Sequence, residues 1–271
     1  MLSMLLQDEG ETSMSIVKKL MSVIIENGSE IEGIFQMKGF PSENGQQVIS
    51  WLEDLKCVNF PKLMYIWMGA KHSVSLQHLH KINICNCPKL KSIFSISVLR
   101  VLPLLKILVV EQCEELEQII EDDAEENENV QSPQVCFPQL KFLLVAHCNK
   151  LKHLFYIRTS HAFPELEYLT LNQDSSLVQM FKVGPGARDG RVEVLLPKLI
   201  HVMLMQLPNL NDICQGIVEF QTLTNLLVHN CPKFSITSTT SIEDMLQSFD
   251  RGMLYNPSVS FCAFVFSKVI T

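Results

Sequence analysis

The chain has 271 residues, a formal net charge of −7 and nine cysteines, and 47% of its residues are hydrophobic. The acidic balance gives no indication of a nucleic-acid surface. The opening apolar run, residues 1–6, is too short for a secretory signal, and the uncharged stretch 252–267 falls short of the roughly 20 residues that a membrane helix needs. We therefore expect a soluble protein without a membrane span.

One pattern of apolar residues recurs along nearly the whole chain. It reads L-x-x-L-x-V-x-x-C-x-x-L-x-x-I between Leu105 and Ile119, and with position zero placed three residues before Leu105 it predicts eight repeats. These begin at Val17, Ile49, Leu76, Leu102, Phe137, Phe163, Leu196 and Phe220. Every repeat has leucine at offset three and apolar residues, including one cysteine, at offsets six and eight.

This spacing predicts an α/β repeat fold, a leucine-rich-repeat solenoid. Offsets six and eight lie on one face of a short strand, and apolar residues spaced by three indicate irregular or 3₁₀ turns on the convex side. Stacked coils bury one another's apolar edges, and their strands form a parallel sheet on the concave face. We expect a ragged N-terminal segment (1–16), the solenoid (17–236), and a C-terminal part (237–271) with a helix at 241–249 and a strand-like stretch at 259–269.

Four of the cysteines share offset eleven, a position that other repeats fill with Phe60 or Leu207. This exchange predicts buried, reduced thiols and an intracellular protein rather than a disulfide scaffold.

Polar insertions are expected at 39–46, 121–134 and 182–194. Ten acidic residues lie between 111 and 128, and without them the chain has 22 basic and 19 acidic residues (29 − 10 = 19). The acidic loop 121–128 lacks calcium-ligand spacing, and we interpret it as solvated, or as a contact for a basic partner.

No cofactor, metal or catalytic site is predicted. The best metal-binding candidate groups Cys85 and Cys87 with His78 and His80, but the two cysteines lie on different faces of the coil. No nucleophile motif accompanies the eight histidines. His147 and His229 are expected on exposed strand positions of separate coils, which suits binding better than catalysis. The chain is therefore not expected to be an enzyme.

The candidate protein-binding residues occupy offsets five, seven, nine and ten, on the exposed strand positions. Several are apolar where a solvated face is usually polar, which leaves two explanations open: a binding surface anchored by Phe142 and Tyr168, or cover by neighbouring loops. The candidates are Lys81, Asn83, Ile107, Val109, Glu111, Phe142, Leu144, His147, Tyr168, Thr170, Asn172, His201, Met203, Met205, Asn225, Leu227 and His229.

Several repeats resemble those of plant disease resistance proteins of the coiled-coil, nucleotide-binding type. The likeness covers roughly residues 17–236 and is carried by the units INICNCPKLKSIF (82–94), LVVEQCEELEQII (108–120) and LLVAHCNKLKHLF (143–155), and by the F-P-x-L openings at 137–140 and 163–166. The resemblance implies a cytoplasmic immune receptor whose repeats recognise a pathogen effector or an altered host target.

The chain departs from that family plan because it has no G-x-x-x-x-G-K-[ST] phosphate loop. Only the recognition role is therefore expected here, with an effector, a host target or the receptor's own nucleotide-binding domain as partner. Two alternatives stay open. The chain is a regulatory or structural fragment that contacts a neighbouring receptor domain, or a truncated product without an independent role.

Overall fold

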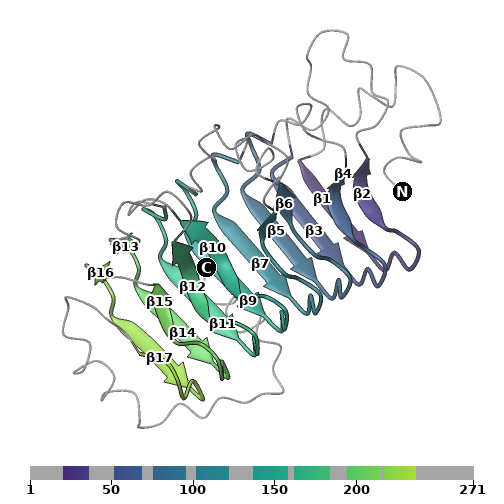
Figure 1. Cartoon of the computed structure of the whole chain (residues 1–271). Coiled ribbons are helices and arrows are strands. Elements are labelled where there is room, and N and C mark those ends of the chain that lie inside the picture. Colours follow the sequence, from purple (N-terminus) through teal and green to yellow (C-terminus); the bar gives the residue numbers. More distant parts are fainter. Residues whose placement is uncertain are drawn as a thin grey trace, which may run out of the picture.

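The computed structural model describes residues 21–36, 52–68, 76–95, 102–121, 137–157, 162–183, 194–214 and 217–235. Their main feature is an eight-stranded parallel sheet in the order β1-β3-β5-β7-β9-β11-β14-β17 (Figure 1). All eight strands have five residues: β1 (Ser22–Glu26), β3 (Asp54–Val58), β5 (Lys81–Cys85), β7 (Ile107–Glu111), β9 (Phe142–Ala146), β11 (Tyr168–Asn172), β14 (His201–Met205) and β17 (Asn225–His229).

The strand register follows the repeat pattern without a slip. Each strand begins five residues after one of the repeat starts given by the sequence, and equivalent offsets pair across neighbours, as in Ile82 with Leu108 and Leu108 with Leu143. Because a slip of one residue would turn the apolar side chains to the wrong face, the buried offsets six and eight fix this register. The leucine-rich-repeat solenoid predicted from the sequence is confirmed.

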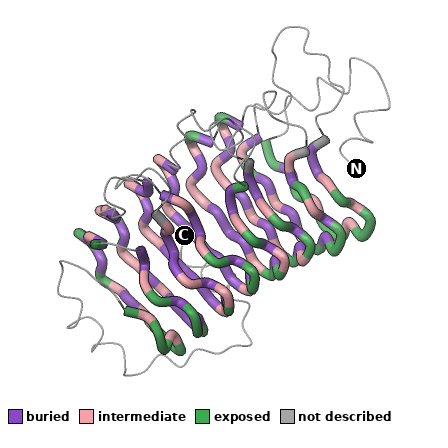
Figure 2. The backbone as a smooth tube through the Cα atoms, in the orientation of Figure 1, coloured by how far each residue is buried: buried purple, intermediate pink, exposed green. Residues whose placement is uncertain are grey.

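The core lies between the sheet and the convex side of each coil. The side chains at offsets six and eight are nearly all buried there, as are the leucines at offset three of the second to eighth repeats. Burial runs along the strands, whereas exposed residues gather at the turns that follow them (Figure 2). Four phenylalanines extend the core along the stack, with ring centroids 5.1–5.9 Å apart between adjacent members: Phe137, Phe155, Phe163 and Phe181.

The convex side differs from the expected irregular or 3₁₀ turns. It carries short strands in small parallel sheets, and no helix occurs in the described residues. Apolar residues of successive coils come side by side here, and their backbones pair. The strands are β2 (Gly33–Gln36) with β4 (Tyr65–Met68), β6 (Phe94–Ser95) with β8 (Ile120–Glu121), β10 (His153–Ile157) with β12 (Gln179–Val183) and β15 (Asp212–Cys214), and β13 (Val194–Leu196) with β16 (Val218–Phe220).

The residue that follows each strand of the main sheet has a left-handed backbone conformation. Offset ten has φ between 53° and 61° in all eight repeats, a conformation that side chains other than glycine seldom adopt. In the first seven repeats its backbone N–H donates to the carbonyl of the last residue of the next strand, as from Asn59 to Cys85 at 3.0 Å. The residues are Asn27, Asn59, Asn86, Gln112, His147, Gln173, Gln206 and Asn230.

Several expectations fall outside the described residues. These are the N-terminal segment 1–16, the C-terminal helix at 241–249, the strand-like stretch at 259–269 and most of the acidic loop, of which Glu121 ends β8. Within the described part of the chain, no helix is long and apolar enough to cross a membrane.

Candidate functional site

Side chains at offsets five, seven and nine of the eight-stranded sheet point away from the core, and we call this surface the strand face. Alternation along each strand produces it, because offsets six and eight turn inward. Its composition changes along the stack. Over β3 and β5 it carries polar residues such as Lys56 and Asn83, whereas from β7 to β14 most of its residues are apolar.

The apolar part forms a second hydrophobic cluster, separate from the core. Five of its side chains are buried: Val109, Phe142, Leu144, Ala146 and Met205. Around them pack the partly buried side chains of Ile107, Tyr168, Met203 and Leu227. We call these nine residues the strand-face cluster. It crosses β7, β9, β11, β14 and β17, so it covers the C-terminal five strands of the sheet.

An aromatic row crosses the strand-face cluster at offset five. The strand register places Tyr168 between Phe142 and His201. The ring of Tyr168 is stacked on that of His201, with centroids 4.9 Å apart and planes at 10°, and lies 6.2 Å from the ring of Phe142. Aromatic rows of this kind offer a large, rigid contact area at a low cost in side-chain entropy.

The seventeen candidate residues differ widely in exposure. Val109, Phe142, Leu144, Thr170, Asn172 and Met205 are buried, and Phe142 keeps only 3% of its side-chain surface exposed. His229 is exposed. The other ten are half-buried: Lys81, Asn83, Ile107, Glu111, His147, Tyr168, His201, Met203, Asn225 and Leu227. Of the two expected anchors, Tyr168 is the more accessible.

Two details of the site depart from the sequence expectation. His147 does not lie on a strand, because it is the left-handed residue of the turn after β9, with a φ of 57°. In the strand order, β11 and β14 lie between His147 and His229, which ends β17. Ala146 belongs to the strand-face cluster and was missed. Its offset, nine, is the signal that would have identified it.

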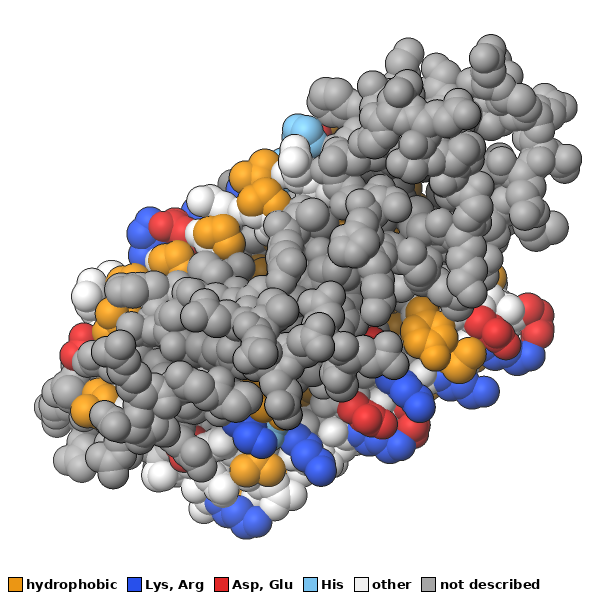
Figure 3. All heavy atoms as spheres, turned by 45° about the horizontal axis from the view of Figure 1, so that its top comes forward, with side chains coloured by type: hydrophobic (Ala, Val, Ile, Leu, Met, Phe, Trp, Pro, Cys, Tyr) orange, Lys and Arg blue, Asp and Glu red, His pale blue; other side chains and the backbone are white. Residues whose placement is uncertain are grey.

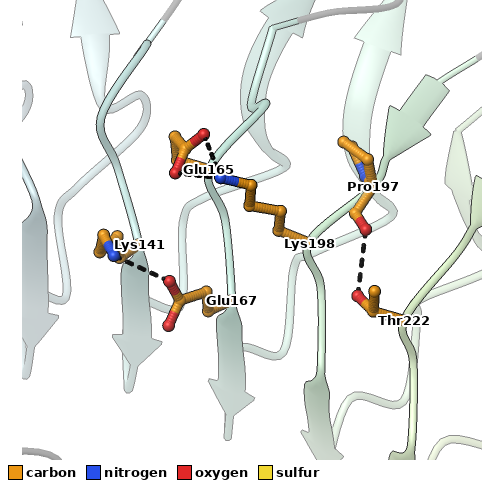
Figure 4. A network of polar contacts seen from close by, with 6 residues as sticks. All are labelled: Lys141, Glu165, Glu167, Pro197, Lys198 and Thr222. Carbon is orange, nitrogen blue, oxygen red and sulfur yellow. Dashed lines mark hydrogen bonds and ion pairs between the residues drawn. The ribbon is translucent and has the colours of Figure 1, made fainter.

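Charged residues join neighbouring coils at both ends of the strands. Before the strands, Lys141 Nζ lies 2.9 Å from Glu167 Oε1, and Lys198 Nζ lies 2.6 Å from Glu165 Oε1 (Figure 4). After the strands, acidic and basic side chains gather along the lower edge of the molecule (Figure 3), and Lys62 Nζ contacts Glu30 Oε2 at 2.5 Å. On the strands themselves, Lys56 Nζ of β3 contacts Glu26 Oε1 of β1 at 2.8 Å. Pairs this exposed contribute about 0–1 kcal/mol each, so they add little to the stability of the stack.

Three of the offset-eleven cysteines, Cys87, Cys113 and Cys148, are buried in the core, as their phase predicts, and Cys231 is partly buried against it. Each thiol donates to the carbonyl two residues earlier, at 3.4–3.6 Å, in Cys87, Cys113, Cys148 and Cys231. Cys85 lies on the other face and donates to Gln112 Oε1 at 3.8 Å, and burial raises its thiol pKa to about 11. Cys85 and Cys87 therefore do not converge. The described residues contain no group of three or more potential metal ligands.

Asp174 occupies offset eleven of its repeat, where sequence reasoning named only cysteine, phenylalanine and leucine. Its carboxyl is buried, and Oδ1 accepts a hydrogen bond from the Cys148 backbone N–H at 2.6 Å. Oδ2 is also buried and has no hydrogen-bond partner among the described residues. Burial raises the pKa of Asp174 to about 7, against the lowering effect of hydrogen bonds from the backbone of Cys148 and Asn172.

Comparison with known proteins gives one family. The leucine-rich-repeat model of RPS2-like plant disease resistance proteins matches residues 11–114 and 114–251. A curated relative, "Probable disease resistance protein At4g27220" from Arabidopsis thaliana, is 32% identical over 94 residues, which cover 34% of this chain and 10% of the relative. The aligned part is thus a small fraction of that protein. No solved structure matches.

The family agrees with the geometry. A leucine-rich-repeat domain is a non-catalytic, protein-binding fold, and its binding surface is built from strand positions that the repeat leaves free. The long parallel sheet and its unbroken register are those of such a domain. The chain belongs to the leucine-rich-repeat family of RPS2-like plant disease resistance proteins.

Proposed function

We propose that this chain is the recognition module of a cytoplasmic plant defence receptor, and that it binds a pathogen effector or a host target through its strand face. The observation that carries the proposal is the strand-face cluster. It is apolar, it is distinct from the core, and it lies on the positions that the repeat pattern leaves free to vary. Apolar residues on strand positions that the repeat pattern does not require to be apolar are suited to a protein partner.

The chemistry of the surface favours a particular kind of partner. The aromatic row of Phe142, Tyr168 and His201 suits apolar or planar side chains, and Met203 adds a polarisable, adaptable contact. The side over β3 and β5 is polar, and Lys56 there is paired with Glu26. We expect a partner with an apolar centre. The free cysteines support a reducing compartment, since all seven described ones are unpaired.

Site-specific photo-crosslinking in plant cells tests this proposal. A crosslinker at Met203, on the strand face, should capture the same partner in repeated experiments, and Tyr168→Ala should abolish capture because it removes the centre of the aromatic row. Lys62→Ala, in the turn after β3, is the matched control and should leave capture unchanged. Equal capture from a crosslinker at Lys182, on convex strand β12, would contradict the assignment of the strand face.

A second candidate is contact with a neighbouring domain of the same receptor. It is favoured by β1, which among the described strands pairs with β3 alone and exposes Ile24 by 64%; Met21, just before β1, is 56% exposed. Ile24→Asp should then weaken that domain contact without affecting capture at Met203. If Ile24→Asp changes neither, this second contact does not exist.

A further inference from the structure

The two ends of the stack carry core positions that stay partly exposed. β1 and β17 are the outer strands of the main sheet and lie at opposite ends of it (Figure 1). In the coils between them, the side chains at offsets eight, eleven and fourteen are all buried. In the first and last coils, apolar side chains at these offsets pack against the core but are only partly buried: Ile25, Ile31, Val228, Cys231 and Phe234.

The backbone of each end is complementary to that of the other. Between neighbouring coils, the N–H at offset ten donates to the offset-nine carbonyl of the following coil, and the N–H at offset four donates to the offset-four carbonyl of the preceding coil. Within the described residues this series stops at the outer coils. The last coil is left with the Asn230 N–H and the Thr224 carbonyl without these bonds, and the first coil with the Glu26 carbonyl and the Met21 N–H. Each group at one end has the matching group at the other.

The two ends also differ in charge. The first coil, residues 21–36, holds three glutamates and no lysine or arginine, whereas the last coil, residues 220–235, holds Lys233 and no acidic residue. Glu30 and Lys233 share offset thirteen, the position at which Lys62 Nζ of the second coil lies 2.5 Å from Glu30 Oε2. Coils placed end to end would bring Lys233 beside Glu30, so charge favours a contact between unlike ends.

We propose that this chain associates head to tail, with the first coil of one copy stacked on the last coil of another as one more coil of the solenoid. β1 then pairs in parallel with β17, and the Asn230 N–H donates to the Glu26 carbonyl of the next copy. Ile24, 64% exposed, covers the half-buried Leu227 at the same offset. A contact between two first coils is disfavoured, because it would place three glutamates against three.

Such a contact is heterologous, because it joins two different surfaces. Each added copy keeps one free end, so assemblies lengthen as the concentration rises. The contact needs no effector or host protein and does not rest on the function proposed above. It gives β1 a different occupant from the neighbouring receptor domain of the second candidate, and the purified chain can be measured without that domain.

Zero-length carbodiimide crosslinking of the full chain tests the contact directly. Within one copy, Glu30 and Lys233 are seven strand spacings apart, about 34 Å at ~4.8 Å each, so an amide link between them forms only between copies. In an equal mixture of nitrogen-15-labelled and unlabelled chain, we expect Glu30–Lys233 links that join labelled to unlabelled peptides. Glu30–Lys62 is the internal control and should link within copies. Formation of the control link without any Glu30–Lys233 link would overturn the proposal.

Two variants that each block one end give a second test, by sedimentation velocity over a range of chain concentrations. Ile24→Asp blocks the first coil, and His229→Glu with Lys233→Glu blocks the last. Each variant alone should raise the apparent dissociation constant of self-association at least tenfold, and their equal mixture should form a dimer that does not lengthen. Tyr65→Asp, on a side chain of β4 that is 42% exposed, is the control and should associate like the parent chain.

Three outcomes would refute head-to-tail association: a parent chain that stays monomeric, an Ile24→Asp chain that associates as strongly as the parent, or a mixture of the two blocked variants that stays monomeric. Amide exchange of β9 must be equal in all chains, which shows that the stack is intact, and the crosslinking result on the parent chain requires no variant. Partner capture at Met203 by a monomeric chain would leave the proposed function standing while the association failed.

Discussion

Asp174 gives the sharpest stability prediction because its carboxyl is buried where other repeats place a thiol. Burial raises its pKa from the ordinary 3.8 to about 7. Between these two values the folded chain keeps a proton that the unfolded chain has lost. Stability is therefore highest below about pH 4 with respect to this group, falls as the pH rises to about 7, and levels off above it.

The size of this effect follows from the shift. At about 1.4 kcal/mol per pKa unit, a shift of about three units corresponds to about 4 kcal/mol of unfolding free energy lost between pH 4 and 7. Asp174→Cys removes the titrating group and restores the residue found at the same offset in Cys87, Cys113, Cys148 and Cys231. Its thiol can donate to the carbonyl two residues earlier, as the other four do.

We expect Asp174→Cys to raise the unfolding free energy at pH 8 by about 2–4 kcal/mol and to flatten its dependence on pH between 4 and 7. Urea unfolding followed by far-ultraviolet circular dichroism at pH 5, 6, 7 and 8 measures both quantities. Ser175→Cys is the matched control, because it adds a thiol at the next residue but leaves the carboxyl in place. The reasoning is refuted if Asp174→Cys keeps the slope of the parent chain, or if its stability at pH 8 does not rise.

Three further substitutions test other parts of the stack. Leu143→Ala removes a fully buried side chain from β9 and should cost about 2–5 kcal/mol in urea unfolding. Gly28→Ala should destabilise the first coil, because the new Cβ would lie 2.2 Å from Phe60 Cε1; amide exchange of β1 should quicken while that of β11 does not change. Lys198→Ala removes an exposed pair with Glu165 and should shift stability by less than about 1 kcal/mol, a difference that 0.5 M salt should abolish.

The main sheet could be predicted from the sequence because a single periodicity determines it. Leucine at offset three and apolar residues at six and eight are needed in every coil, so eight weak signals combine into one strong one. The convex strands could not be predicted in this way. Phe94–Ser95 and Ile120–Glu121 are two-residue strands, and their pairing depends on how neighbouring coils meet rather than on any alternation within them.

The left-handed turn at offset ten could not be predicted from the conformational preferences of its residues. Four of its eight residues are asparagine, which adopts positive φ comparatively easily, but three are glutamine and one is His147. The hydrogen bond from this residue's backbone N–H to the next strand is made in the first seven repeats, whatever the side chain. The stack therefore imposes the conformation, and it moves His147 off the strand on which its offset seemed to place it.

The strand face illustrates a different limit, because the repeat leaves it free. The sequence separates Val109 and Leu144 from the core by phase alone, and the structure agrees. Phase cannot tell a surface that awaits a partner from one that is already covered, since both are apolar. The two cases differ in the cost of binding: a cover that occupies the cluster 99% of the time weakens the apparent affinity about 100-fold, or about 2.7 kcal/mol.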